Sequence, residues 1–326
     1  MRMKWMNKPR VLFPLALLAG LVLPGCDDSP VSQEKKLEPL TEPLVIQHQL
    51  GTTRIAERPQ KVAVLDMNEA DFLDQLGVPI AGMVKDYVPH FLASYRTDAR
   101  VEDLGAITRP NLERIYALRP DLILMTPIQA AQYESLSELA PTLHFDVNFR
   151  DSGSHHIRDV REHLRLLGRV FGKEGVAQDK IAQLDAHLSK VRQVTEGRPE
   201  KALIVMHNNG SFSSFGVHSR YGFVFNALGV KPASTLKDTS LHGQPVSSEF
   251  INRADPDILY IIDRTAVMER RPIMQAEQMA NPLLRRTTAW QKGNVVFVDA
   301  DAWYITAASP TSLQRVFDDV IKGYQQ

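Results

Sequence analysis

The feature that most constrains the fold is a segment that occurs twice in the chain. The first copy, Glu113 to Leu124, reads ERIYALRPDLIL, and the second, Glu249 to Tyr260, reads EFINRADPDILY. Each copy has a glutamate seven residues before a Pro-Asp pair, followed by an apolar run. Because proline disfavours helical geometry in the residue before it, each copy predicts a short helix that ends there and leads into a buried strand. The repetition therefore predicts two similar lobes.

Other segments repeat in the same order. Apolar runs occur at residues 61–65 and 201–206, and each series later reaches a Leu-Gly-Val sequence, at 76–78 and at 228–230. Apolar runs without alternation, separated by helices, are typical of a parallel sheet buried on both faces. The predicted fold class is α/β, with two similar lobes, each with a central, mostly parallel sheet. We expect the N-terminal lobe at 44–152 and the C-terminal lobe at 199–326.

Residues 153–198 predict a long helical connector between the lobes. Apolar residues recur there at spacings of three and four, first from Ile157 to Val170 and then, after Gly172, from Ile181 to Val194. This is helical periodicity. Two packed helices and one long helix both fit the pattern. A helical connection is stiffer than extended strands, so it predicts small lobe movements on ligand binding.

The N-terminus predicts export. Arg2, Lys4, Lys8 and Arg10 come before an apolar run at 11–23, and no acid interrupts them. The run is about 13 residues long, whereas a membrane-spanning helix needs about 20. The sequence therefore predicts a cleaved signal peptide over residues 1–25.

Cys26 is the only cysteine, so no disulfide can form within the chain. With Leu23-Pro24-Gly25 before it, it resembles the lipobox of bacterial lipoproteins, although Pro24 departs from the usual residue type at its position. The resemblance implies that Cys26 is lipidated, and Asp27 resembles the signal that retains such lipoproteins on the inner membrane. Residues 26–43 are rich in Pro, Glu, Ser and Lys and predict a disordered tether. We expect a periplasmic, lipid-anchored protein.

Charge and motifs argue against several classes of function. Loss of residues 1–25 leaves 38 − 4 = 34 Lys and Arg against 38 Asp and Glu, a net charge of −4. A nucleic-acid partner is therefore not expected, because phosphate binding needs a clustered basic excess. The G-x-S-x-G, P-loop and H-E-x-x-H patterns are all absent. We do not expect an enzyme, although a spatial Ser-His-Asp arrangement stays open at this stage.

The two lobes, the helical connector and the paired Glu and Pro-Asp segments look like the class III binding proteins of ABC importers for siderophores, haem and cobalamin. From about Leu44 to the C-terminus the chain most resembles the group that binds catecholate siderophores of the enterobactin type. Four motifs carry this resemblance in order: Ser219-Arg220-Tyr221-Gly222, His242-Gly243, Asp263-Arg264 and Trp303-Tyr304.

The resemblance implies a monomer that captures a ferric siderophore and delivers it to an ABC importer, a permease with its ATPase. The ligand would be of the catecholate type, with a tetradentate siderophore as one possibility. No intrinsic cofactor is expected, since the Fe(III)–siderophore complex is the ligand. A haem or cobalamin binding protein of the same class is the alternative function.

Positive charge is expected around the iron centre, because catecholate oxygens are anionic and arginine stays protonated. The resemblance implies three arginines, of which two match Arg220 and Arg264. The third position falls near Ile128, which is a departure from the pattern. Arg109 is a candidate to supply the missing charge from the same lobe. A surface or structural ion pair is the alternative for each arginine.

His242 and Tyr304 match the two residues that, by resemblance, coordinate iron when a tetradentate siderophore leaves two positions open. Imidazole and phenolate are both known iron ligands. Such a pair favours tetradentate over hexadentate ligands. The alternatives are a polar loop residue for His242 and a packed aromatic for Tyr304.

Glu113 and Glu249 occupy the same place in the two repeats. The resemblance implies that each forms a salt bridge with an arginine of the permease, one per lobe. Acids also stabilise the first turn of a helix, by about 0.3–1 kcal/mol, and both roles can hold at once.

Overall fold

The structure is a computed structural model, and it describes residues 38–237 and 240–325. The predicted signal peptide, Cys26 and the tether up to residue 37 lie outside the described residues. Within the described ranges, no helix combines the length and apolar content that crossing a bilayer requires.

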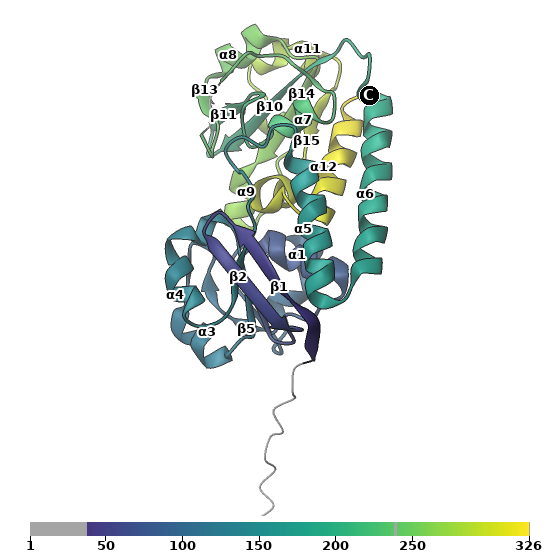
Figure 1. Cartoon of the computed structure of the whole chain (residues 1–326). Helices are drawn as coiled ribbons and strands as arrows, with labels where there is room; N and C mark the ends of the chain where they lie inside the picture. Colours follow the sequence, from purple (N-terminus) through teal and green to yellow (C-terminus); the bar gives the residue numbers. More distant parts are fainter. Residues whose placement is uncertain (1–37, 238–239, 326) are drawn as a thin grey trace, which may run out of the picture. The chain divides into compact units, whose positions relative to one another are not determined.

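The first lobe is built on a five-stranded parallel sheet (Figure 1). Its strands, in spatial order, are β5 (Glu102–Asp103), β4 (Gly82–Met83), β3 (Val62–Val64), β8 (Leu122–Met125) and β9 (Thr142–His144). Every residue of β3 and β8 is buried, as the unalternating apolar runs predict. A small hairpin, β6 (Gly105–Ala106) and β7 (Arg109–Pro110), lies outside this sheet.

The second lobe has a six-stranded mixed sheet. Its main path is β13 (Gln244–Val246), β11 (Ser211–Phe215), β10 (Lys201–Asn208), β14 (Ile258–Asp263) and β15 (Val295–Phe297), and β12 (Lys231–Pro232) also pairs with β10. The pairs of β10 with β12 and β14, and of β14 with β15, are parallel, whereas β11 is antiparallel to both of its neighbours. The predicted α/β class with two similar lobes is confirmed.

The duplicated segment forms the same helix in each lobe, α3 (Leu112–Leu118) and α8 (Ser248–Ala254). The side chains of Asn111 and Ser247 cap the two helices by accepting hydrogen bonds from backbone N–H groups of the first turn. Each helix ends in a left-handed residue directly before the proline, Arg119 or Asp255. The predicted helix ends are therefore confirmed.

The aspartate of each Pro-Asp pair also has the same role in both lobes. Asp121 accepts a hydrogen bond from the backbone N–H of Lys61, at 2.9 Å, and Asp257 accepts one from that of Lys201, at 3.0 Å. Each aspartate thus connects its own strand to the start of the neighbouring strand. This shared contact gives a physical reason for the repeated sequence.

The connector consists of two helices, α5 (His156–Phe171) and α6 (Glu174–Thr195), with left-handed Gly172 between them. Of the two arrangements that the periodicity allows, the structure has the pair, which lies side by side in Figure 1. Helix α6 reaches both lobes: Lys180 Nζ donates to Gln75, and Arg192 Nε donates to the carbonyl of Ala227.

An N-terminal hairpin, β1 (Pro39–His48) and β2 (Gly51–Glu57), precedes the first sheet. The prediction of a disordered tether up to residue 43 is wrong for residues 39–43, which belong to β1. Pro39 pairs with Glu57, and an irregularity in register separates this pair from Leu44 and Ile55. Composition alone misses such a strand, because its backbone hydrogen bonds come from a segment farther along the chain.

The other helices cover the sheets and close the chain. They are α1 (Met67–Leu76), α2 (Ser94–Thr97), α4 (Tyr133–Ser137), α7 (Gly222–Asn226), α9 (Arg264–Glu269), α10 (Ala276–Met279), α11 (Thr288–Gln291), a π-helical segment (Asp301–Thr306) and α12 (Pro310–Lys322). Helix α12 packs on α1 and α6, so the C-terminal helix returns to the first lobe and the connector.

We expect Gly222→Ala to destabilise the fold by about 1–3 kcal/mol, the usual cost of overpacking. A Cβ at this position would meet the backbone carbonyl oxygen of Val217, which has little freedom to move. Gly175→Ala is the matched control, because no atom lies within 4 Å of its added Cβ. Urea unfolding of both variants checks the difference, and equal stabilities would contradict it.

Candidate ligand-binding site

A cavity of about 550 Å³ lies between the two lobes. The first lobe lines it with Asp86, Tyr87, Ala106, Ile107, Thr108, Ile128 and Phe149, and the second lobe with Arg220, Leu241, His242, Arg264, Met268, Tyr304 and Ile305. The structure thus brings together Arg220, Arg264, His242 and Tyr304, which are far apart in the sequence.

Arg264 is the first residue of α9, directly after strand β14. Its Nε donates a hydrogen bond of 2.6 Å to the hydroxyl of Tyr304, and its Nη1 donates one of 2.9 Å to Asn208 Oδ1. The guanidinium carbon lies 5.2 Å from the centroid of the Tyr304 ring. Two acceptors and a ring therefore hold this guanidinium at the carboxyl end of the second-lobe sheet, where α/β proteins usually bind ligands.

Arg220 approaches Tyr304 from another segment of the second lobe. Its side chain is mostly covered, with 7% of the residue exposed, and its Nη2 donates to the backbone carbonyl of Tyr304 at 3.1 Å. Its Nε is buried and finds no acceptor among the described residues. The next residue, Tyr221, donates through its hydroxyl to the carbonyl of Trp303. The Ser-Arg-Tyr-Gly motif is thereby fixed to the π-helical segment that carries Tyr304.

His242 lies beside Tyr304, with 6.5 Å between the ring centroids. Burial lowers the pKa of His242 below its ordinary value, and the charges of Arg264 and Arg220 lower it further. The imidazole is therefore neutral at neutral pH, which is the form that binds metal ions. On geometry and charge, this wall of the cavity can receive a metal centre with anionic ligands.

Arg109 does not line this cavity. It is exposed on β7, and its neighbour Thr108 lines the cavity instead. This corrects the expectation that Arg109 supplies a third positive charge to the ligand. Ile128, near which the resemblance places the missing arginine, does line the cavity.

Sequence reasoning missed several lining residues, among them Asp86, Tyr87 and Phe149. Asp86 accepts a hydrogen bond from the backbone N–H of Ile107, and burial raises its pKa. Tyr87 has a left-handed backbone with φ of 55°, which is rare for a residue other than glycine. Asp86 and Phe149 come soon after strands β4 and β9, and a position beyond the carboxyl end of a parallel strand is the signal that points to them.

Glu113 and Glu249 are exposed in the first turns of α3 and α8, one in each lobe. A hydrogen bond with Ser247 lowers the pKa of Glu249. Their equivalent places and their exposure leave both carboxylates accessible to a partner. Their position in the first turn also suits an acid that stabilises the helix start.

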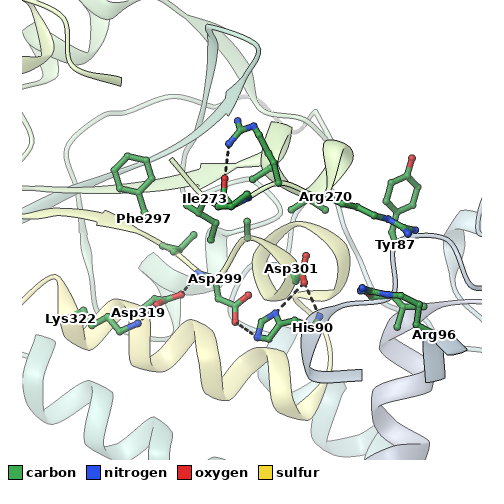
Figure 2. A pocket seen from close by; sticks show the side chains of 17 residues that line it. Tyr87, His90, Arg96, Arg270, Ile273, Phe297, Asp299, Asp301, Asp319 and Lys322 are labelled. Atoms are coloured by element: carbon green, nitrogen blue, oxygen red, sulfur yellow. Dashed lines mark hydrogen bonds and ion pairs between the residues drawn. The ribbon is translucent and has the colours of Figure 1, made fainter. Parts of the chain in front are cut away.

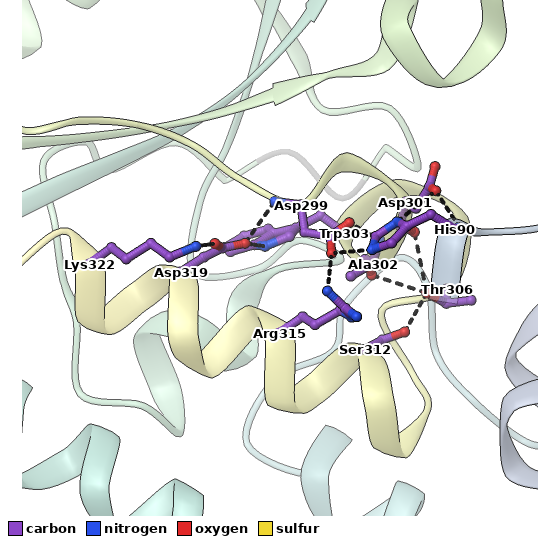
Figure 3. A network of polar contacts seen from close by, with 10 residues as sticks. All are labelled: His90, Asp299, Asp301, Ala302, Trp303, Thr306, Ser312, Arg315, Asp319 and Lys322. Carbon is purple, nitrogen blue, oxygen red and sulfur yellow. Dashed lines mark hydrogen bonds and ion pairs between the residues drawn. The ribbon is translucent and has the colours of Figure 1, made fainter. Parts of the chain in front are cut away.

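A second cavity, of about 540 Å³, also lies between the lobes (Figure 2). Many of its charged groups are paired. His90 of the first lobe lies 3.1 Å from Asp301 and 3.4 Å from Asp299, and Arg315 and Lys322 bind Asp299 and Asp319 (Figure 3). These pairs make the cavity a polar contact between the lobes, although Arg270, which also lines it, has no ion pair among the described residues.

The fold and the first cavity define a two-lobed α/β binding protein with its ligand site between the lobes. The chain belongs to the periplasmic binding protein family, and the match to this family extends over residues 62–302. The ferric-anguibactin-binding protein FatB of Vibrio anguillarum is 63% identical over 305 residues, which cover 94% of each chain.

Two solved structures extend the comparison. The siderophore binding protein BauB, bound to a complex between two molecules of acinetobactin and ferric iron, has a TM-score of 0.84 at 63% identity and covers 87% of this chain and 99% of its own. The catecholate-siderophore binding protein VctP of Vibrio cholerae has a TM-score of 0.79 at 30% identity, with coverage of 86% and 99%. These relatives are binding proteins, and the predicted family resemblance is confirmed.

The contact between His90 and Asp301 predicts a pH-dependent stability. The hydrogen bond with Asp301 raises the pKa of His90, against the effect of burial, and the charge of Asp299 adds to the increase. The stabilisation is therefore complete below the ordinary histidine pKa of about 6.5 and is lost as the pH rises through the higher folded value.

We expect His90→Gln to lower the free energy of unfolding more at about pH 5.5 than at about pH 8.5, by less than about 1 kcal/mol because the ring is half exposed. Urea unfolding at both pH values measures this difference. His155→Gln, at an exposed histidine, serves as the control. A loss that is independent of pH would contradict the prediction.

Proposed function

We propose that this protein captures a ferric siderophore of the catecholate type in the first cavity and delivers it to an ABC importer. The observation that carries the proposal is the pair Arg220 and Arg264, which flank Tyr304 on one wall. Arginine stays charged at physiological pH and suits anionic oxygens. The ferric ligands named for FatB and BauB, and the catecholate siderophore named for VctP, support this assignment.

The remaining lining favours a ligand that is less anionic than a tris-catecholate complex. The resemblance places a third arginine near Ile128, where this cavity has an apolar side chain, and Asp86 adds an acid to the cavity. Ile107, Phe149 and Met268 offer apolar surface against which aromatic rings of a siderophore can pack. A ferric siderophore complex with mixed donor groups fits this balance.

His242 and Tyr304 are proposed to coordinate the iron where the siderophore leaves positions open. They lie on the same wall, the imidazole is neutral, and the tyrosine hydroxyl is already oriented by Arg264. In this arrangement the arginines neutralise the siderophore oxygens while the two side chains complete the coordination sphere.

Delivery is proposed to use Glu113 and Glu249, one per lobe, as salt-bridge partners of permease arginines. The predicted signal peptide at 1–25 and lipidation of Cys26 would hold the protein, as a monomer, at the periplasmic face of the inner membrane. Its partners are then the ferric siderophore, the permease and its ATPase, with lipid contact through the anchor alone.

The direct test is a titration of the purified protein with a ferric tetradentate catecholate complex and, separately, with haemin, followed by tryptophan fluorescence. We expect quenching by the catecholate complex and a phenolate-to-iron charge-transfer band that Tyr304→Phe removes. Tyr87→Phe, at a tyrosine of the same cavity, is the matched control and should keep the band.

Each outcome of this titration is informative. Tight haemin binding without a response to catecholates would reject the siderophore in favour of a haem carrier. An unchanged spectrum and affinity in Tyr304→Phe would remove Tyr304 from the coordination sphere, while siderophore capture would stand.

The docking proposal predicts that the double variant Glu113→Ala/Glu249→Ala binds the ferric siderophore normally but imports it poorly. The matched control is Glu134→Ala/Glu277→Ala, which removes an exposed first-turn glutamate from one helix in each lobe. Uptake of radioactive iron by cells that carry each variant measures the difference. Full import by the first double variant would refute the docking role.

A further inference from the structure

A separate cavity of about 200 Å³ lies in the first lobe, between β1, the end of β9 and helix α5. It shares no lining residue with the ligand cavity. Three histidines line it. His163 of α5 is paired with Glu69 through Nε2. The other two are His48 at the end of β1 and His144 at the end of β9, and their ring centroids are 5.9 Å apart. The hydrogen bonds of each ring determine which of its two nitrogens carries the proton and which has a free lone pair.

The tautomer of His48 follows from Thr53. The Thr53 hydroxyl donates its single hydrogen to the backbone carbonyl of Thr142, so toward His48 it can only accept. His48 Nε2, 2.9 Å away, must therefore carry a proton and donate it. The lone pair of the neutral ring is then on Nδ1, which is buried and finds no donor among the described residues.

His144 is oriented in an equivalent way by a carboxylate. Its Nδ1 lies 2.6 Å from Asp146 Oδ1, so the proton is on Nδ1 and the lone pair of the neutral ring on Nε2. The His144 side chain is only 2% exposed, and Nε2 also has no partner among the described residues. A carboxylate that accepts from one nitrogen while the other stays free is the arrangement that orients metal-binding histidines.

The surroundings favour a cation. Asp146, Asp159 and Glu162 line the same cavity, while Arg158 pairs with the latter two at 2.9 and 3.9 Å. Two imidazoles that share an ion at about 2.0–2.1 Å from each nitrogen place their ring centroids about 5–6.5 Å apart, depending on the N–metal–N angle. The observed separation of 5.9 Å is compatible with that geometry.

We propose that His48 Nδ1 and His144 Nε2 bind one divalent late-transition-metal ion, Cu²⁺, Ni²⁺ or Zn²⁺, at a site distinct from the ferric siderophore. Imidazole nitrogen suits these ions, with Cu²⁺ bound most tightly. Within residues 38–237 and 240–325, no three His, Cys, Asp or Glu side chains are already grouped around one point. Water therefore completes the coordination, and the ion connects the β1–β2 hairpin to the first-lobe sheet.

The test is calorimetric titration of purified, tag-free, chelator-treated protein with CuSO₄, NiSO₄ and ZnSO₄. We expect a single ion per chain, with nitrogen coupling in the electron paramagnetic resonance spectrum of the Cu²⁺ form. His48→Gln and His144→Gln should abolish binding, and Asp146→Asn should weaken it about 10–100-fold. His155→Gln, at an exposed histidine outside the cavity, is the control and should bind as the wild type does.

Thermal unfolding gives a second measurement, because an ion that binds only the folded chain raises its Tm. The increase should be present in the wild type and absent in His48→Gln. Absence of binding by the wild type, or normal binding by His48→Gln, would overturn the proposal. Loss of binding in His242→Ala alone would also overturn it, since the ion would then belong to the siderophore cavity. If His144→Gln does not fold, His48→Gln decides the question, since His48 is only partly buried.

Discussion

The buried polar face of helix α1 is the interaction on which the rest of the structure depends. Asn68, Glu69 and Asp71 are all fully buried, and each binds a different part of the chain. Asn68 accepts from the backbone N–H of Ala308, Asp71 accepts from that of Thr311, and Glu69 pairs with His163 of α5. Burial raises the pKa of Asp71 to about 6. Because a buried polar group without a partner costs about 1–3 kcal/mol, α1 fixes the C-terminal segment and the connector at once.

This constraint reaches the ligand site through a short stretch of backbone. Tyr304 comes four residues before Ala308, and Ala307, left-handed with φ of 61°, offers its carbonyl to His156 of α5. The wall that carries Tyr304 belongs to the second lobe in sequence but is also held by the first lobe and the connector. A large rotation between the lobes would break these buried contacts, which is a second reason to expect small movements on ligand binding.

The sequence predicted the elements whose causes are local. Helices α3 and α8 each lie between a capping side chain and a proline a few residues later. The repetition of this pattern in the sequence allowed both helices to be predicted. Prediction from the sequence failed where contacts between distant segments determine the structure. Residues 39–43 form a strand because they pair with β2. The β6–β7 hairpin places Thr108, and not Arg109, in the lining of the cavity. Only the family resemblance identified the candidate ligand-binding residues Arg220, Arg264, His242 and Tyr304. No local sequence rule predicts that four segments so far apart in the chain lie together. Asp86 and Phe149 have only their places after strands to indicate them.

The two interlobe cavities differ in how their carboxylates and arginines are arranged. In the second, carboxylates face a histidine, an arginine and a lysine, and the pairs stabilise the lobe contact. In the first, each guanidinium has five N–H groups, and among the described residues Arg220 and Arg264 use only some of them, on Tyr304 and Asn208. Guanidinium N–H groups that the protein holds in place, but that have no acceptor within it, lose little conformational freedom when they bind an anionic ligand. This incomplete use of donors, more than the size of the cavity, is the structural reason for the proposal that a negatively charged complex binds at the wall around Tyr304.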